Sequence, residues 1–450
     1  MSTSGKDVDK LLSMMRQAPA QAAQARPEVA QRAYDTAFDT LPQYQQIKFQ
    51  REFAAFAALE VPYYRLHAGR SAATAMIGNR ELVNFASYDY LGLNGHPDIV
   101  AAAEAATREF GTSVSASRIS AGERQVHRDL EQLLARNYAA EDCIVFNSGH
   151  GGGVSTIASL VGPKDLIVQD ALIHNCIVVG AQLSGATRRN FPHNDLDALE
   201  RLLAGERSRF ERCLIATEGL FSMDGDGPDL ARLIEIKQRY GAWLMMDDAH
   251  ALGVLGATGR GIFEHQGVAP GGVDLWFGTL SKTLVGCGGY VAGSAVLVDL
   301  LKCHAPSFVY SVGMPAAVAA ASAKALEIMN AEPERVTKLQ ANSQRFLTRA
   351  KALGLDTGDA WGYGIIPVIV GETVRTLVLA QELQKRGFNA FPILPPGVPE
   401  KSSRLRFFIN ATHSDAQIDA AVDAVAEALD TVKDVSAMAV LKLRSQQSPS

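Results

Sequence analysis

Short apolar runs that each end in a polar or glycine-rich loop recur between residues 140 and 300 of the chain. They predict strands at residues 144–146, 166–168 and 214–216, and a further apolar run ends at Asp247 and Asp248. A helical pattern follows each loop, with apolar residues recurring at helical spacing. Several β-loop-α units in succession predict one large α/β domain that is doubly wound around an open parallel sheet.

The regions on either side have a different pattern. Strands expected at residues 364–370 and 404–410, with a helix at 374–386 between them, predict a smaller α+β region near the C-terminus. We therefore expect four parts: an N-terminal helical arm at 1–80, a large domain at 81–330, a small C-terminal domain at 331–435 and a tail at 436–450. The end of this tail from Ser445, SQQSPS, is expected to be disordered.

Composition narrows the class of protein. With 47% hydrophobic and 20% charged residues in 450, the chain is typical of a soluble α/β enzyme. A net charge of -5 without a basic stripe argues against nucleic-acid binding. The five cysteines are scattered and form no CxxC pair, which argues against a disulfide framework or a zinc site and fits the reducing cytoplasm. No apolar run is long enough to span a membrane, while contact with a membrane surface stays open.

The stretch FGTLSKTLVGCGGYVAG, residues 277–293, carries the strongest chemical signal. It places Lys282 after two hydroxyl residues, Thr279 and Ser281, and before a run of glycines. A lysine that forms a Schiff base with a phosphate-bearing aldehyde would use these groups together, and pyridoxal 5'-phosphate (PLP) is such an aldehyde. A surface lysine in a glycine-rich loop is the alternative.

Other candidate groups lie where predicted strands end. The sequence NSGHGGG follows the strand at 144–146 and predicts an anion-binding turn at a helix N-terminus, with Gly149 and His150 in it. Asp247 and His250 follow another strand, as expected for the ligand crevice of a parallel sheet. A metal site is disfavoured there because Asp247 and Asp248 point to opposite faces of the strand. His174 by itself reads as a structural residue.

The ordered series EGLFSMDGD, MMDDAHALGVLG, GTLSKT and GCGGYVAG closely resembles the α-oxoamine synthases among the fold-type-I PLP enzymes, over about residues 84–412. The resemblance implies an aspartate aminotransferase-like fold, a large doubly wound domain with a smaller α+β domain, and a homodimer with active sites at the subunit interface. Such enzymes join a small α-amino acid to an acyl thioester, release CO2 and form an α-aminoketone.

The resemblance also implies roles for individual residues around the cofactor ring. Lys282 matches the Schiff-base lysine, and Asp247 matches the carboxylate that pairs with the pyridine nitrogen. His250 and Ser222 match groups near the phenolic oxygen of the ring. His174 matches the histidine that stacks on the ring, which replaces the structural interpretation given above.

Further matches concern the phosphate and the substrate. Gly149 and His150 match the phosphate turn, although the family usually has an aromatic residue in place of His150. Thr279 and Ser281 match hydroxyls that bind the phosphate, and Ser311 matches a hydroxyl that reaches the phosphate of the partner subunit. Arg406 matches the arginine that holds the substrate carboxylate, a task that suits bidentate guanidinium geometry.

The substrate is less well determined. The asparagine that the family usually has near Tyr88 has no clear counterpart here. Serine with a long-chain acyl thioester, the serine palmitoyltransferase reaction of sphingolipid synthesis, is the expected chemistry, and glycine- or alanine-using synthases are the alternatives. The acyl donor is expected to be acyl-CoA or an acyl carrier protein. Basic residues before Glu81 could bind either donor, and they include Arg16, Arg26, Arg32, Lys48, Arg51, Arg65 and Arg70.

Two other classes share parts of this pattern. A plain aminotransferase or decarboxylase would have the fold and the lysine but is not expected to show the continuous series of synthase motifs. A non-catalytic partner subunit of a synthase would be expected to lose the lysine, whereas Lys282 is present.

Overall fold

The computed structural model describes residues 36–57 and 59–436. The chain divides into two compact units, one that ends at Ala54 and one that begins at Ala55. The described part of the first unit is helical, with a short 3-10 turn, Phe38–Thr40, followed by helix α2, Pro42–Phe56. Proline at the first position of α2 has no amide hydrogen to leave unpaired and favours helix initiation.

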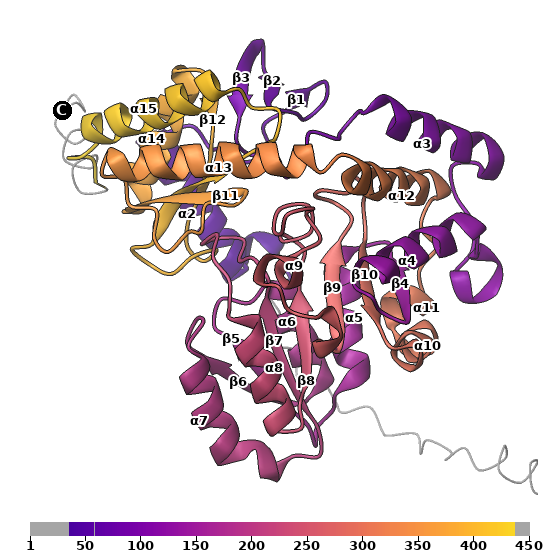
Figure 1. The fold of residues 1–450 in the computed structure, drawn as a ribbon. Coiled ribbons are helices and arrows are strands. Elements are labelled where there is room, and N and C mark those ends of the chain that lie inside the picture. Colours follow the sequence, from indigo (N-terminus) through magenta and orange to yellow (C-terminus); the bar gives the residue numbers. More distant parts are fainter. Residues whose placement is uncertain (1–35, 58, 437–450) are drawn as a thin grey trace, which may run out of the picture. The chain divides into compact units, whose positions relative to one another are not determined.

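A seven-stranded sheet forms the centre of the second unit (Figure 1). Its strand order is β4-β10-β9-β8-β7-β5-β6. The strands are β4 (Asp142–Phe146), β5 (Leu166–Asp170), β6 (Thr187–Phe191), β7 (Cys213–Glu218), β8 (Trp243–Asp247), β9 (Leu275–Thr279) and β10 (Gly289–Gly293). The sheet is therefore located where the apolar runs predicted it.

The expectation of an all-parallel sheet is wrong at one strand. Strand β10 is antiparallel to both of its neighbours, β4 and β9, while the other pairs are parallel. The connection from β9 to β10 spans residues 280–288, which is too short for the helical crossover that a parallel return requires. This short connection carries Lys282, so the reversal of the chain places the lysine at the end of β9.

Successive side chains of each strand pack into two different cores, which explains the continuous apolar runs. In β4, Val145 belongs to one buried cluster and Ile144 to the other, and in β7 Ile215 and Leu214 divide in the same way. One core includes side chains of α4 (Gln125–Asn137), α7 (Leu196–Glu206) and α8 (Leu230–Arg239). The other includes side chains of α5 (Gly149–Leu160), α6 (Asn175–Ser184) and α10 (Ala295–His304). A sheet buried on both faces confirms the doubly wound prediction.

The C-terminal part is α+β, as predicted. Strands β11 (Ile365–Gly371), β14 (Ser403–Phe408) and β13 (Phe391–Ile393) form an antiparallel sheet in that order. The helices around it are α13 (Glu334–Ala352), α14 (Thr373–Lys385) and α15 (Asp415–Thr431). Other helices of the second unit include α3 (Pro97–Phe110), α9 (Ile262–Gln266), α11 (Pro306–Val309) and α12 (Ala316–Ala331). None of the helices in the described part is both long and apolar enough to cross a lipid bilayer.

The helical arm expected up to residue 80 is wrong over its last segment. Residues 67–84 form three strands, β1 (His67–Ala68), β2 (Thr74–Ile77) and β3 (Arg80–Asn84). The turn between β2 and β3 contains Gly78, whose φ of 64° allows a tight hairpin, so the expected boundary at residue 80 separates two paired strands. Strand β3 also pairs with β12 (Phe388–Asn389). The beginning of the arm (residues 1–35) and nearly all of the tail (437–450) lie outside the described residues.

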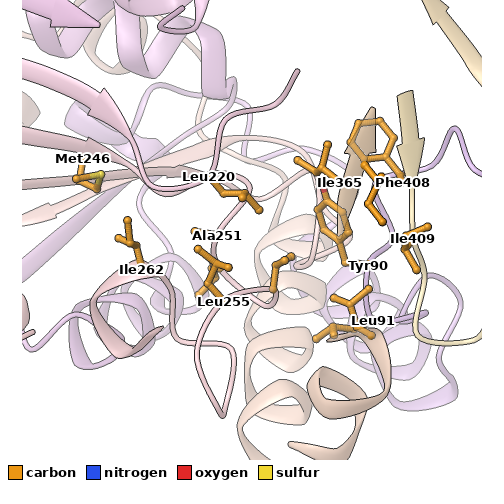
Figure 2. Packing of buried hydrophobic residues seen from close by; sticks show 14 of the residues in the cluster. Tyr90, Leu91, Leu220, Met246, Ala251, Leu255, Ile262, Ile365, Phe408 and Ile409 are labelled. Atoms are coloured by element: carbon orange, nitrogen blue, oxygen red, sulfur yellow. The ribbon is translucent and has the colours of Figure 1, made fainter. Parts of the chain in front are cut away.

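A single buried cluster connects the large sheet with the C-terminal sheet. Figure 2 shows Tyr90, Ile365 and Phe408 close together in this cluster, which also contains Met246 of β8 and Leu255. Because Phe408 lies on the same strand as Arg406, this packing fixes β14 against the edge of the large sheet where β8 ends.

Candidate active site

A cavity of about 460 Å³ contains ten of the eleven residues that the sequence singled out as site residues. These ten are Gly149, His150, His174, Ser222, Asp247, His250, Thr279, Ser281, Lys282 and Arg406. A larger cavity of about 590 Å³ is lined by residues such as Tyr138, Trp243 and Trp276, and none of the eleven lies in it. The smaller cavity is therefore the candidate active site, since it gathers the ionisable groups.

Lys282 and Asp247 both line this cavity, and each shifts the pKa of the other. Burial lowers the pKa of the Lys282 amine to about 8, although the charges of Asp247 and Glu218 act in the opposite direction. Burial raises the pKa of Asp247, which the nearby His174 and Lys282 counteract. A lysine with a lowered pKa has a larger share of neutral, nucleophilic amine near neutral pH than an exposed lysine has.

Asp247 and Asp248 do point in different directions, as predicted. Asp247 lines the cavity, and its Oδ1 accepts a hydrogen bond from the Ala249 amide at 3.0 Å. Asp248 is fully buried elsewhere, where its Oδ2 accepts a hydrogen bond from the Tyr138 hydroxyl at 3.2 Å. Burial raises the pKa of Asp248 to about 7. Asp248 therefore lies in the protein interior outside the cavity, and Asp247 lies in the cavity, where it can contact a ligand.

Glu218 is a site residue for which the sequence assigned no role. It was expected in a polar loop, but it is the last residue of β7 and lies opposite Asp247 in the register of β7 and β8. Its side chain is buried, and its Oε1 has no hydrogen-bond partner among the described residues. Burial and the charge of Asp247 raise its pKa well above the usual range, which favours the neutral acid.

His250 is held by two aromatic residues. Its Nδ1 lies 2.7 Å from the Tyr90 hydroxyl, and its ring is parallel to that of Phe408 at 6.1 Å between centroids. Burial lowers the pKa of His250 well below its ordinary value, and Lys282 and Arg406 act in the same direction. The imidazole is therefore neutral. Tyr90 is a second residue that the sequence analysis missed, although it follows Tyr88 at strand-like spacing.

Arg406, on β14, is buried but only partly paired. Its Nη1 donates to the Ser222 carbonyl oxygen at 3.1 Å, and its guanidinium lies 4.4 Å from the centre of the Phe408 ring. Its Nε is buried and has no hydrogen-bond partner among the described residues. Burial lowers its pKa, while the nearby hydroxyls of Tyr88 and Tyr90 raise it. An arginine with an unused donor in a cavity is suited to binding a carboxylate.

The other end of the cavity is suited to an anion. Helix α5 begins at Gly149, so the glycines of NSGHGGG lie inside its first turns, and Ser148 caps it by accepting a hydrogen bond from the Gly151 amide at 3.0 Å. A Cβ at position 149 would lie 3.0 Å from Thr279 Oγ1, so only glycine fits there easily. The Oγ atoms of Thr279 and Ser281 are 2.8 Å apart. Free amides at a helix N-terminus together with two hydroxyls form a phosphate cradle.

The two histidines near this cradle come from different helices. His174 was expected inside a helix, but it is the N-cap of α6, where its side chain accepts a hydrogen bond from the Cys176 amide. His150 lies on the first turn of α5, with its Nε2 3.2 Å from Asn175 Oδ1 and its ring 6.4 Å from the His174 ring. Burial lowers the pKa of His174, which favours a neutral ring that can stack on a flat cofactor.

Ser311 is not part of this cavity. It lines a separate hollow with residues that include Ser115, Ser117 and Tyr310. The role that the resemblance implies for Ser311, contact with the phosphate of a partner subunit, stays a prediction. The described residues contain no group of three or more metal-binding side chains.

The side chains of the cavity fit PLP. Lys282 offers the amine for the Schiff base, and Asp247 offers a buried carboxylate for the pyridine nitrogen. The phosphate fits the cradle at Gly149, where a Cβ on residue 149 would occupy part of the space. On a doubly wound sheet with a smaller α+β region, this combination defines a fold-type-I PLP-dependent transferase.

Comparison with known proteins gives the family. Residues 80–425 match the model of the family "Aminotransferase class I and II". A putative 8-amino-7-oxononanoate synthase of Gloeobacter violaceus is 43% identical over 365 residues, which cover 81% of this chain and 92% of that protein. The 8-amino-7-oxononanoate synthase of Methylobacterium nodulans is 41% identical over 360 residues, 80% of this chain and 90% of that protein.

Among solved structures, a serine palmitoyltransferase of Sphingomonas wittichii is similar, with a TM-score of 0.84, 28% identity, and coverage of 88% of this chain and 100% of that one. A structure of SPT with PLP has a TM-score of 0.84 at 25% identity, with the same coverage. The chain belongs to the class I and II aminotransferase family, and within it this protein is a PLP-dependent α-oxoamine synthase.

The first prediction concerns the attachment of the cofactor. We expect the purified protein to carry PLP on the amine of Lys282, so that borohydride reduction fixes the cofactor to the peptide containing this residue. Lys282→Ala should lose the reducible linkage, whereas Lys164→Ala, at an exposed lysine on the surface, should retain it. Peptide mapping after reduction measures this, and a label on another lysine would contradict it.

The second prediction separates the neighbouring carboxylates. Asp247→Asn should reduce kcat strongly, because removing one partner of a buried charge pair costs about 3–5 kcal/mol. Asp248→Asn should have a much smaller effect, because Asp248 is outside the cavity and its raised pKa, about 7, already makes it partly neutral at neutral pH. Steady-state kinetics with a melting curve for each variant test this, and equal losses of kcat would reverse the assignment.

Proposed function

We propose that this enzyme catalyses the decarboxylative condensation of alanine with an acyl thioester whose chain ends in a carboxylate. The names of the relatives support this choice. 8-Amino-7-oxononanoate has its amine on C8 beside a terminal methyl carbon, the pattern that alanine leaves after losing its carboxyl group, and C1 to C7 represent the acyl part. Relatives with this name are 41–43% identical to the chain, whereas the serine palmitoyltransferase with a similar structure is 28% identical.

The observation that carries the proposal is the arrangement of Arg406 opposite the Lys282–Asp247 pair in one cavity. The guanidinium of Arg406, which lines the cavity, can donate to the carboxylate of an amino acid whose nitrogen lies near Lys282. Tyr88 and Met223 line the cavity beside Arg406, and Met223 Sδ lies 3.3 Å from Arg406 Nη1. These two side chains would contact the substituent on Cα and so distinguish alanine from serine or glycine.

Each residue has a task in this reaction. Bound PLP supplies an electron sink for the charge that develops at Cα. Asp247 keeps the pyridine nitrogen protonated, and the neutral amine of Lys282, with its pKa near 8, accepts and returns the proton at Cα. His174 would pack against the bound cofactor, and Arg406 would hold the carboxylate of the amino acid. These two residues would orient the substrate and so influence which of its bonds reacts.

We also propose that the enzyme acts as a homodimer in which Ser311 completes the cofactor site of the partner subunit. In the described chain Ser311 lies away from its own Lys282 cavity, in a hollow beside the exposed side chain of Tyr310. A hydroxyl in this position would serve a neighbouring subunit rather than its own.

Serine with a long acyl chain is the second candidate, and the similarity to the serine palmitoyltransferase structure favours it. Purified enzyme given glycine, alanine and serine, each with a seven-carbon ω-carboxyacyl thioester and a palmitoyl thioester, distinguishes the two. We expect the highest kcat/KM for alanine with the ω-carboxyacyl chain. Higher kcat/KM for serine with palmitoyl thioester would replace our first choice.

The same comparison can identify the thioester carrier. We propose that an acyl carrier protein serves at least as well as CoA, with basic residues before Glu81 as the docking surface, of which Arg16, Arg26 and Arg32 lie outside the described residues. Docking through exposed charges weakens as salt rises, because screening is strong beyond about 8–10 Å at physiological ionic strength. Rates measured with the CoA form and with the carrier-protein form of each thioester across a salt series test this. Turnover with the CoA form alone would exclude the carrier protein as donor.

The third prediction concerns the substrate carboxylate. Arg406→Ala should raise KM for the amino acid by about tenfold or more while the cofactor remains bound, since a charge-assisted hydrogen bond contributes roughly 1.5–3 kcal/mol. Arg406→Lys should recover only part of this, because lysine lacks the planar fork of donors. Arg386→Ala, at a surface arginine paired with Glu427, is the control. An unchanged KM together with loss of cofactor would assign Arg406 to cofactor binding.

A further inference from the structure

His193 forms a bridge between two buried carboxylates just outside the cavity. Its Nδ1 lies 3.0 Å from Asp170 Oδ1, and its Nε2 lies 2.9 Å from Asp226 Oδ2. The side chain of Asp170 is completely buried and that of Asp226 is 8% exposed. Both ring nitrogens face carboxylate oxygens, so each can donate a hydrogen bond when both carry protons, and the geometry favours an imidazolium.

The electrostatics agree with this geometry. Burial opposes the charge on His193, but its hydrogen bonds to Asp170 and Asp226 outweigh burial and raise its pKa to about 10. The bridge is therefore charged throughout the physiological range. Its ring also packs edge-on against Phe221, with 4.4 Å between centroids and an interplanar angle of 87°.

One carboxylate of the bridge fixes the segment that leads to His174. Asp170 ends β5, and its Oδ1 also accepts a hydrogen bond from the Leu172 amide at 2.8 Å. Its backbone carbonyl accepts a further hydrogen bond from the Ile173 amide at 3.2 Å. The five residues from Asp170 to His174 are therefore held as a compact turn, which determines where the N-cap of α6 presents the His174 ring.

Asp226, the other acidic residue of the bridge, closes the turn that carries Ser222 through its backbone. The Phe221 amide donates to the Asp226 carbonyl oxygen at 2.8 Å, and the Gly225 amide donates to the Phe221 carbonyl oxygen at 2.9 Å, which closes the turn. This turn also binds β14. The Ser222 carbonyl oxygen accepts a hydrogen bond from Arg406, and the Met223 carbonyl oxygen accepts one from Arg404. The position of Arg406 thus depends on a turn that His193 anchors.

We propose that His193 is a positioning residue: its doubly paired imidazolium joins the His174 turn to the Ser222 turn and thereby sets the distance between the cofactor-stacking ring and the carboxylate-binding Arg406. His193 does not line the cavity, so it acts through these two turns. The part that concerns Arg406 rests on the proposed function, whereas the part that concerns cofactor retention does not.

The test uses the PLP-loaded enzyme with His193→Gln and, separately, Asp226→Asn, each of which removes one charge of the bridge. We expect each variant to raise KM for the amino acid by about tenfold or more, to leave KM for the acyl thioester within about twofold, and to release PLP faster on dilution into an apoenzyme acceptor. The double variant should lose little more than either single one, because both substitutions break one unit. His304→Gln, at an exposed histidine at the end of α10, is the control.

The outcomes separate positioning from a merely structural role. Melting curves report folding of each variant, and PLP release reports the cofactor site without any substrate, so failure of the alanine proposal would leave this readout intact. Unchanged PLP release and unchanged amino-acid KM in a folded His193→Gln would overturn the inference. Equal increases in both KM values that follow a lowered melting midpoint would overturn it as well, since they would show a general loss of structure.

Discussion

The burial of a lysine beside a carboxylate, Lys282 beside Asp247, is the constraint on which the site depends. Neither charge is well solvated there, and burial shifts the pKa of each group toward its neutral form. Their mutual attraction opposes this shift. Buried charges without a full set of hydrogen-bonded partners cost stability, and a ligand bound in the cavity would supply partners for both groups.

The fold provides that place through the edge of its sheet. Strands β7 and β8 are buried on both faces, so their interiors accept only apolar side chains, and polar residues come where the strands end. Glu218 and Asp247 end these neighbouring strands in register. The antiparallel return of β10 then brings the connection that carries Lys282 to the same edge. Three groups distant in sequence meet because one sheet ends there.

Much of this arrangement could be predicted from the sequence, because strands buried on both faces leave long apolar runs with charged residues after them. The apolar run before Asp247 and the glycines after Lys282 pointed to two of the site residues, whereas Ser222, His174 and Arg406 were assigned only through the family resemblance. Ten of the expected residues line one cavity. Local patterns did not reveal partners that are far away in the chain. Tyr90 meets His250 across 160 residues, and His193 meets Asp226 across 33 residues. Such contacts depend on tertiary packing, which spacing along the chain does not encode.

Two sequence-based expectations failed for reasons that are physically clear. The glycines at 149–153 suggested a turn, yet they lie in the first turns of α5, because side chains there would collide with Thr279, Phe146 or Cys176. Glycine is used here for close packing, and its helix-breaking tendency is overridden by tertiary contacts. The hairpin at Gly78 was overlooked because its strands are short and only half buried, which weakens the alternating pattern.

The charges around the cavity follow a division between paired and unpaired groups. Groups that face the cavity keep unused hydrogen-bonding atoms: Arg406 has a free Nε and Glu218 a free Oε1 among the described residues. Charged groups one layer further out are paired with each other, with His193 between two carboxylates and Arg404 bound to Asp224 at 2.6 Å. A buried pair holds its geometry because separating it would leave two unsolvated charges. The outer pairs therefore fix the backbone, and the inner groups stay free to bind.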